Sequence, residues 1–213
     1  MSALDAELVA GLEALGLPVE ADTRDRLLRF LEELLRWNRR VNLTAITDPL
    51  AALRQHLLDS LSVVPHLRGP SLLDVGSGGG LPGLPLAIVR PDLAVHSVES
   101  RQKKVSFQRH AAAVLGLGNF RAEAARVEAM VAVYPQVISR AFASLARFVE
   151  LAGPRVAPGG ELLAMKGHAP EDELAALPSG WQLVTMPRLT VPGLQAQRHL
   201  VILRRREEGP PAP

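Results

Sequence analysis

The feature that most constrains this chain is an apolar run followed by a glycine-rich turn, Leu72–Gly83. Leu72, Leu73 and Val75 form the short apolar run expected of a parallel strand that is covered on both faces. The last eight positions of the stretch hold five glycines, which let the backbone turn sharply and approach a ligand because no Cβ intervenes. A helix is predicted behind the turn, with free N–H groups at its start that attract polar or negative groups. The stretch therefore predicts a cofactor site in an α/β fold.

Two cofactor classes fit this turn. The dinucleotide fingerprint G-x-G-x-x-G fails from Gly76, because position 81 is leucine, but matches from Gly78 with a proline inside it. The pattern acidic-x-Gly-x-Gly-x-Gly, formed by Asp74, Gly76, Gly78 and Gly80, resembles the first motif of the S-adenosylmethionine-dependent methyltransferases. In that superfamily the loop packs against the methionine part of the cofactor. A carboxylate at Asp74 can hold an ammonium group or an ordered water, whereas it would repel a pyrophosphate.

A second acidic residue, Glu99, ends the next predicted strand, 93–98. In nucleotide-binding α/β folds an acidic residue at this place accepts hydrogen bonds from ribose hydroxyls. Both cofactor classes predict such a residue, so Glu99 does not distinguish between them.

The remaining pattern is a helical N-terminus followed by alternating strands and helices, with two late strands that can pair antiparallel. Helices are predicted at 3–15, from Asp22 or Thr23 to 38, from 49 with Asp48 as its cap, and at 101–115, 125–131, 143–152 and 170–177. Further strands are predicted at 119–122, 136–139, 161–165, 183–189 and 199–204. We therefore expect a helical extension at 1–70 packed on a catalytic domain at 71–206, and a disordered tail at 207–213.

Composition excludes several function classes. The 213 residues are 47% hydrophobic, enough for one α/β domain with an extension, and contain no cysteine, which excludes disulfides and thiolate chemistry. The six histidines have no ligand-like spacing, so we predict no metal. A net charge of +2 with a pI near 9.5 permits a nucleic-acid partner without requiring one. Because neither a membrane-spanning run nor a signal layout is visible, we expect a soluble cytoplasmic protein without membrane contact.

Several short motifs, in order along the chain, carry a more specific resemblance. They are Trp37-Asn38 with Asn42-Leu43-Thr44, His56-Leu57-Leu58-Asp59-Ser60, the glycine loop with Leu81-Pro82-Gly83, Ile138-Ser139-Arg140-Ala141-Phe142-Ala143-Ser144-Leu145, Lys166-Gly167 and Arg198-His199-Leu200. With them the chain resembles the bacterial glucose-inhibited division protein B family, the 16S ribosomal RNA guanine-N7 methyltransferases. The family often has Asp-Ser where this chain has Glu99-Ser100, a change that keeps the carboxylate.

The resemblance implies a fold and a cofactor. The implied fold is an α/β, Rossmann-like class I methyltransferase with a mostly parallel seven-stranded sheet, a final antiparallel hairpin and an N-terminal helical extension. The implied cofactor is S-adenosyl-L-methionine, with S-adenosyl-L-homocysteine as product. The implied cofactor-binding residues are Asp74, Gly76, Gly78, Gly80, Leu81, Glu99, Ser100, Arg101, Val127, Glu128 and Arg140.

The resemblance also implies the reaction and its partner. Arg140 and Lys166 are the implied catalytic residues, where the methyl group meets N7 of a guanine in 16S ribosomal RNA or the small ribosomal subunit. N7 carries a lone pair and no proton, so alignment in a dry pocket suffices and no general base is needed. The expected RNA contacts of this presumed monomer are Arg36, Arg39, Arg40, Asn42, Lys103, Lys104, Lys166 and Arg198. Two alternatives stay open, an NAD(P)-dependent oxidoreductase and a non-catalytic RNA-binding module.

Overall fold

The computed structural model describes residues 2–140 and 142–206, and the tail expected to be disordered, 207–213, lies outside the described residues. A seven-stranded sheet with the order β3-β2-β1-β4-β5-β7-β6 runs through the molecule. The neighbours from β3 to β5 pair in parallel, and β7 is antiparallel to both β5 and β6, as the sequence predicted. The strands are β1 Ser71–Val75, β2 Ala94–Glu99, β3 Phe120–Ala124, β4 Tyr134–Ser139, β5 Val156–Lys166, β6 Trp181–Thr185 and β7 His199–Arg205.

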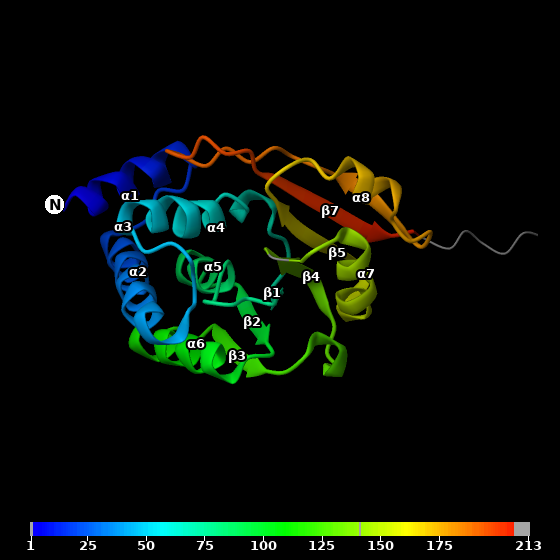
Figure 1. Ribbon diagram of the computed structural model, residues 1–213, viewed down its shortest axis with the longest axis horizontal. Helices are drawn as coiled ribbons and strands as arrows, with labels where there is room; N and C mark the ends of the chain where they lie inside the picture. The colour runs from blue at the N-terminus through cyan, green and yellow to red at the C-terminus, as the bar shows by residue number, and fades with distance from the viewer. Residues whose placement is uncertain (1, 141, 207–213) are drawn as a thin grey trace, which may run out of the picture.

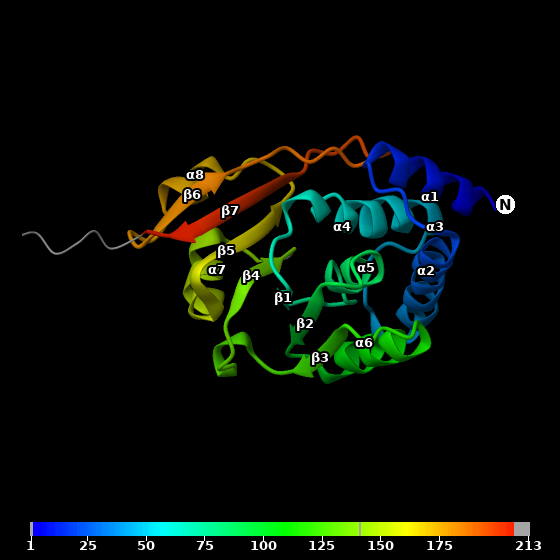
Figure 2. The ribbon, with the colours of Figure 1, turned by 180° about the vertical axis from the view of Figure 1, so that it is seen from behind.

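Helices cover the two faces of the sheet unequally. Figures 1 and 2 show α2, α5 and α6 on one side of the strands and α7 on the other. None of the helices within residues 2–140 and 142–206 is long and apolar enough to cross a membrane. The helices are α1 Ala3–Ala14, α2 Ala21–Val41, α3 Pro49–Ala52, α4 Asp59–Leu61, α5 Gly83–Val89, α6 Gln102–Val114, α7 Leu145–Ala152 and α8 Glu171–Ala175.

The central strand is apolar on both faces, because successive side chains point to opposite sides of a strand. Leu72 belongs to a large buried cluster on the α5 and α6 side, and Leu73 to a second cluster on the α7 side. The large cluster also contains Leu27 and Phe30 of α2, together with Phe107 of α6. The N-terminal helices and the sheet therefore share one hydrophobic core.

Two predictions about the N-terminal helices need correction. The second helix begins at Ala21 after Glu20, which forms no side-chain cap, so the cap predicted at Asp22 or Thr23 was wrong. It ends at Val41 because Asn42 adopts a left-handed conformation with φ of 53°. The cap at Asp48 is confirmed, since its Oδ1 accepts the Ala51 N–H at 2.7 Å.

The predicted third helix is not uniform. It begins as α3, widens into the π-helical segment η1, Leu53–Leu58, and continues as α4. A π-turn holds more residues than an α-turn and rotates the following side chains around the axis. The segment therefore sets the direction of the side chains near residues 55–59.

Two further boundaries differ from the prediction. The helix expected at 125–131 is only the single turn η3, Val127–Ala129. The strand expected to begin at 161 begins at Val156 and continues through Pro158-Gly159-Gly160, where β4 and β5 shift register. Gly160 permits this course, because a Cβ there would lie 2.6 Å from the carbonyl oxygen of Pro135. Close backbone approach, not a chain reversal, is the reason for that glycine.

The shared core generates a stability prediction. Leu34 of α2 is fully buried, and a Cβ built on Gly79 would lie 2.9 Å from Leu34 Cδ1. Leu34→Ala should lower the free energy of unfolding by about 2–5 kcal/mol in one cooperative urea transition. The control Leu183→Ala, at a position 41% exposed, should change it by less than about 1 kcal/mol. If the N-terminal helices of the variant unfolded at a lower urea concentration while the urea midpoint of the sheet stayed unchanged, the helices and the sheet would not share one cooperative core.

Candidate functional site

The glycine loop leaves the carboxyl end of β1, between β2 and β4, where the order of the strands reverses. Gly76, Gly78 and Gly80 have φ values of 68°, 56° and 76°, a left-handed conformation that side chains with a Cβ rarely adopt. A Cβ on Gly79 would lie 2.9 Å from Leu34 Cδ1, so the side chain of Leu34 would have to shift. The alternating glycines are therefore required by the backbone path and by the helix packed behind it.

A buried polar network supports the loop from β2 and α6. Gln108 donates from Nε2 to Ser77 Oγ at 2.8 Å and to the Gly78 carbonyl at 2.9 Å. Its Oε1 accepts from Ser97 Oγ at 2.6 Å, and the two serine hydroxyls are hydrogen-bonded to each other. The sequence analysis missed this support, because hydrogen bonds between segments distant in the chain leave no local pattern.

Glu99 at the end of β2 is tied to the loop. Its Oε2 accepts the Gly78 N–H at 3.1 Å and its Oε1 accepts the Arg101 N–H at 2.9 Å. Ser100 Oγ also donates to Oε1 at 3.4 Å, so it is Oε2, with a single hydrogen bond, that keeps a further lone pair. Ser100 and Arg101 are exposed beside it. After β3, Val127 is buried against the same cluster as Val98, and Glu128 is exposed, so both predicted adenine contacts follow the neighbouring strand.

Asp74 lies directly below the loop and is fully buried. Its Oδ2 accepts the Gly83 N–H at 2.8 Å, whereas its Oδ1 has no hydrogen-bond partner within the described residues. Burial raises the pKa of Asp74 to about 7, although the Gly83 hydrogen bond and the Arg140 charge act in the opposite direction. A buried oxygen without a donor suits an ammonium group or an ordered water. The residues present therefore fit the methionine end of S-adenosylmethionine.

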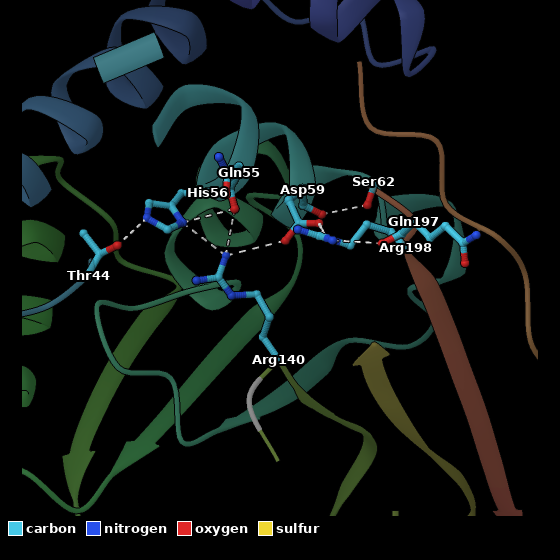
Figure 3. Close-up of polar contacts among 8 residues, drawn as sticks. All are labelled: Thr44, Gln55, His56, Asp59, Ser62, Arg140, Gln197 and Arg198. Atoms are coloured by element: carbon cyan, nitrogen blue, oxygen red, sulfur yellow. Dashed lines mark hydrogen bonds and ion pairs between the residues drawn. The ribbon is translucent and has the colours of Figure 1, made fainter. Parts of the chain in front are cut away.

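A pocket of about 330 Å³ opens at the carboxyl ends of β4 and β5. Arg140, the residue after β4, extends into it (Figure 3). Its Nη1 donates to the Gln55 carbonyl at 3.1 Å and lies 3.6 Å from Asp59 Oδ2. The pocket is lined by Ile46, Gln55, His56, Asp59, Arg140, Met165, Lys166, Gly167 and Arg198.

His56 connects Arg140 to the end of α2. Arg140 Nη1 lies 3.3 Å from His56 Nδ1, and the opposite nitrogen, Nε2, lies 2.7 Å from Thr44 Oγ1. Nδ1 also lies 3.1 Å from the Gln55 carbonyl. Arginine can only donate and a carbonyl can only accept, so these two contacts favour opposite tautomers, and the Thr44 hydroxyl can pair with Nε2 in either one. Asn38 Oδ1 in turn accepts the N–H groups of Leu43 and Thr44 at 2.7 and 2.9 Å.

His56, Asp59 and Gln55 were not predicted as site residues. The segment from His56 to Ser60 was noticed only as a shared motif, and no local signal placed it at the end of β4. Asp59 is also bound from the other side, since Arg198 Nε donates to its Oδ1 at 2.9 Å. Two arginines therefore flank one carboxylate that is 3% exposed.

The predicted basic residues fall into two groups. Lys166 is paired with Glu173 at 2.9 Å, Arg198 with Asp59, and Arg36 with Glu33. These three charges are therefore partly neutralised within the chain. The second group makes no ion pair within the described residues and contains the exposed Arg39, Arg40 and Lys103 and the half-buried Lys104. Asn42 is exposed at the end of α2.

Trp37 lies beside a hollow of about 440 Å³ between α2 and α6, whose lining also includes Arg39 and Arg40. It is half-buried, with its ring 5.6 Å from that of Phe107 and 5.0 Å from that of His110. Trp37 therefore packs against α6 at the edge of the hydrophobic core. No group of three or more His, Asp or Glu side chains within residues 2–140 and 142–206 is arranged to hold a metal ion.

Comparisons with known proteins give the family. Residues 23–201 match GidB, described as rRNA small subunit methyltransferase G. The ribosomal RNA small subunit methyltransferase G of Azoarcus sp. (strain BH72) is 54% identical over 201 residues, covering 93% of this chain and 95% of that protein. The protein of the same name from Ralstonia nicotianae (strain ATCC BAA-1114 / GMI1000) is 50% identical over 209 residues, covering 93% and 94%.

The fold has solved counterparts. The glycopeptide N-methyltransferase MtfA complexed with S-adenosyl-L-methionine matches with a TM-score of 0.62 and 10% identity, covering 71% of this chain and 88% of its own. At that identity the likeness concerns the fold, which is the Rossmann-like class I methyltransferase fold. The family match covers most of α2, all of α3 and α4 and nearly all of the sheet, and it confirms the resemblance seen in the motifs. The chain belongs to the GidB family, rRNA small subunit methyltransferase G.

Proposed function

We propose that this chain transfers a methyl group from S-adenosyl-L-methionine to N7 of a guanine in 16S ribosomal RNA. The observation that carries the proposal is the position of Arg140, which lies 3.6 Å from Asp59 in the pocket and follows β4, the strand that pairs with β1 at Ile138 and Asp74. The loop and the pocket are therefore neighbours at one sheet edge, as donor and acceptor sites must be. Family membership gives ribosomal RNA as the substrate class and supports a cytoplasmic location for the reaction.

The chain supplies a plausible holder for each part of the cofactor. Glu99 has acceptor capacity left for ribose hydroxyls, and Asp74 Oδ1 suits the methionine ammonium group. When bound, the cofactor supplies an electrophilic methyl group. The dinucleotide alternative is less well supported, because a pyrophosphate would meet the Asp74 carboxylate. We assign Gly76, Gly78, Gly80 and Leu81 to the methionine end, and Ser100, Arg101, Val127 and Glu128 to the adenosine end.

Direct displacement agrees with the pocket's chemistry. Guanine N7 has no proton to lose, so a general base has no task, and positioning supplies the rate. His56 does not serve as a base in this account, because burial, followed by the charge of Arg140, lowers its pKa to about 4. Its contacts to Thr44 and Arg140 instead hold the guanidinium in place. Lys166 also lines the pocket, and its ion pair with Glu173 fixes the position of its ammonium group there.

The experiment is a tritiated-methyl transfer assay with purified small ribosomal subunits and with naked 16S RNA, followed by mapping of the product. We expect one labelled methyl group per RNA, located at a single guanine. The RNA chain should be cleavable at that guanine by chemistry specific for N7-methylguanosine. Binding of RNA without any transfer would favour the non-catalytic module, and binding of NAD(P) in place of S-adenosylmethionine would favour the oxidoreductase.

Glu99→Gln tests the ribose contact. The amide keeps one acceptor oxygen, so either Gly78 N–H or Arg101 N–H loses its partner, and the cofactor loses a charged acceptor. We expect S-adenosylmethionine to bind about 1–3 kcal/mol more weakly by calorimetry. The matched control is Glu123→Gln on the neighbouring strand, where the side chain is 51% exposed. An unchanged Kd for Glu99→Gln would leave this carboxylate a purely structural role.

The packing of His56 on Arg140 predicts a pH dependence of stability. The pKa of His56 falls from 6.5 to about 4 on folding, so between these values the unfolded chain binds more protons and stability falls as pH falls. Asp74 acts oppositely, since its raised pKa of about 7 makes the folded chain bind more protons above 3.8. Asp74 is present in both the parent and His56→Gln, so its contribution cancels when their free energies of unfolding are subtracted at each pH.

We therefore expect the stability of the parent relative to His56→Gln to decrease by about 2–3 kcal/mol between pH of about 7.5 and about 4.5. Urea unfolding at the two pH values measures it. His66→Gln is the control, because the ring of His66 is only half-buried and its pKa is lowered less far. A difference that does not change with pH would show that His56 is protonated as readily in the fold as in solution.

A further inference from the structure

Asp59 is a buried carboxylate with unused acceptor capacity inside the pocket. Its Oδ1 accepts from Arg198 Nε at 2.9 Å, but its Oδ2 is 3.6 Å from Arg140 Nη1, beyond hydrogen-bond distance. Figure 3 shows the carboxylate between the two arginine side chains. An ionised carboxylate has about four lone-pair sites, so donors from a ligand can still bind. A ligand that brings N–H groups to this place would complete the coordination of Asp59.

Three charged groups lie in sequence from the glycine loop into the pocket. Asp74 lies under the loop and is the register partner of Ile138 on β4. Arg140 follows two residues later and lies 3.6 Å from Asp59, which lines the pocket. Arg140 uses Nη1 on the Gln55 carbonyl and keeps other N–H donors. From the loop inward, the site therefore offers first the methyl donor position, then a hydrogen-bond donor, then an acceptor.

The edge of guanine presents the complementary order. N7 is an acceptor, O6 beside it is an acceptor, and N1–H with the N2 amino group are donors. Adenine has a donor at position 6 and an acceptor at N1, so both groups would oppose this arrangement. The pocket volume of about 330 Å³ accommodates one purine base.

We propose that Asp59 selects guanine by accepting hydrogen bonds from N1–H and the N2 amino group, while Arg140 donates to O6. The proposal rests on the proposed function and names the group that determines base specificity. Arg198 holds the carboxylate in place without contacting the base. N7 is then left free of protein and directed toward the glycine loop.

The test compares guanosine with inosine, which keeps N7, O6 and N1–H but lacks the N2 amino group. Small subunits are reconstituted from ligated 16S RNA with one or the other base at the methylated position, and kcat/KM for methyl transfer is measured. The parent should prefer guanosine by about 10- to 100-fold, as expected for a charge-assisted hydrogen bond. Asp59→Asn should reduce that preference to within about threefold. Because the preference is a ratio from one preparation, partial unfolding of the variant cancels.

Arg198→Gln is the matched control, since it breaks the same ion pair but retains the Asp59 carboxylate. Its rate should fall while its preference for guanosine stays above about tenfold. A parental preference in Asp59→Asn, or equal loss of preference in both variants, would overturn the inference and give Asp59 a structural role. Absence of transfer to guanosine by the parent would instead overturn the proposed function itself.

Discussion

The guanidinium of Arg140, half-buried at the reversal of strand order, is the interaction on which the site depends. A charge withdrawn from water requires acceptors, and these come from both parts of the chain. From the N-terminal helices, the Gln55 carbonyl accepts a hydrogen bond and Asp59 forms an ion pair. Asp74 of the first strand contributes only its negative charge. The N-terminal extension is therefore a component of the pocket, because without it Arg140 would lose most of its partners.

The π-helical segment explains how the extension provides those partners. The carbonyl of Gln55, the ring of His56 and the carboxylate of Asp59 all reach the same guanidinium from η1 and the start of α4. π-turns are found frequently at functional sites, where the changed winding redirects side chains. Thr44, fixed by Asn38 at the end of α2, then orients the imidazole. A geometric irregularity in one helix thus serves the chemistry at the end of a distant strand.

The loop on the other side of Arg140 is rigid for separate reasons. Its glycines adopt left-handed conformations, Glu99 accepts a backbone N–H from it, and Gln108 binds both Ser77 and Gly78. Such a turn is shaped before a ligand arrives, so little conformational entropy is lost on binding. A reaction that depends on aligning the methyl donor with guanine N7 requires that both the glycine loop and the pocket be preorganised.

The sequence predicted the parts of the site that follow strands, because the carboxyl ends of parallel strands meet at one edge. Asp74 and Glu99 were predicted in this way, whereas Arg140 and the seven-stranded sheet were implied by the family resemblance. The sequence could not predict Asp59, whose arginine partners lie 81 and 139 residues away in the chain. Nor could it predict Gln108, whose partners lie 11 to 31 residues away and leave no periodic pattern. Nor did local signals reveal that Glu173 neutralises Lys166. Packing between distant segments decided each of these.

The most direct test of the account is the structure of this chain with S-adenosyl-L-homocysteine bound. The account predicts that the ribose hydroxyls lie within about 3 Å of the Glu99 carboxylate and that the sulfur faces the pocket beside Arg140. The glycine loop should keep its backbone conformation. A ligand seated elsewhere, for example in the hollow beside Trp37, or a sulfur directed away from Arg140, would contradict the placement of methyl donor and acceptor on which the account depends.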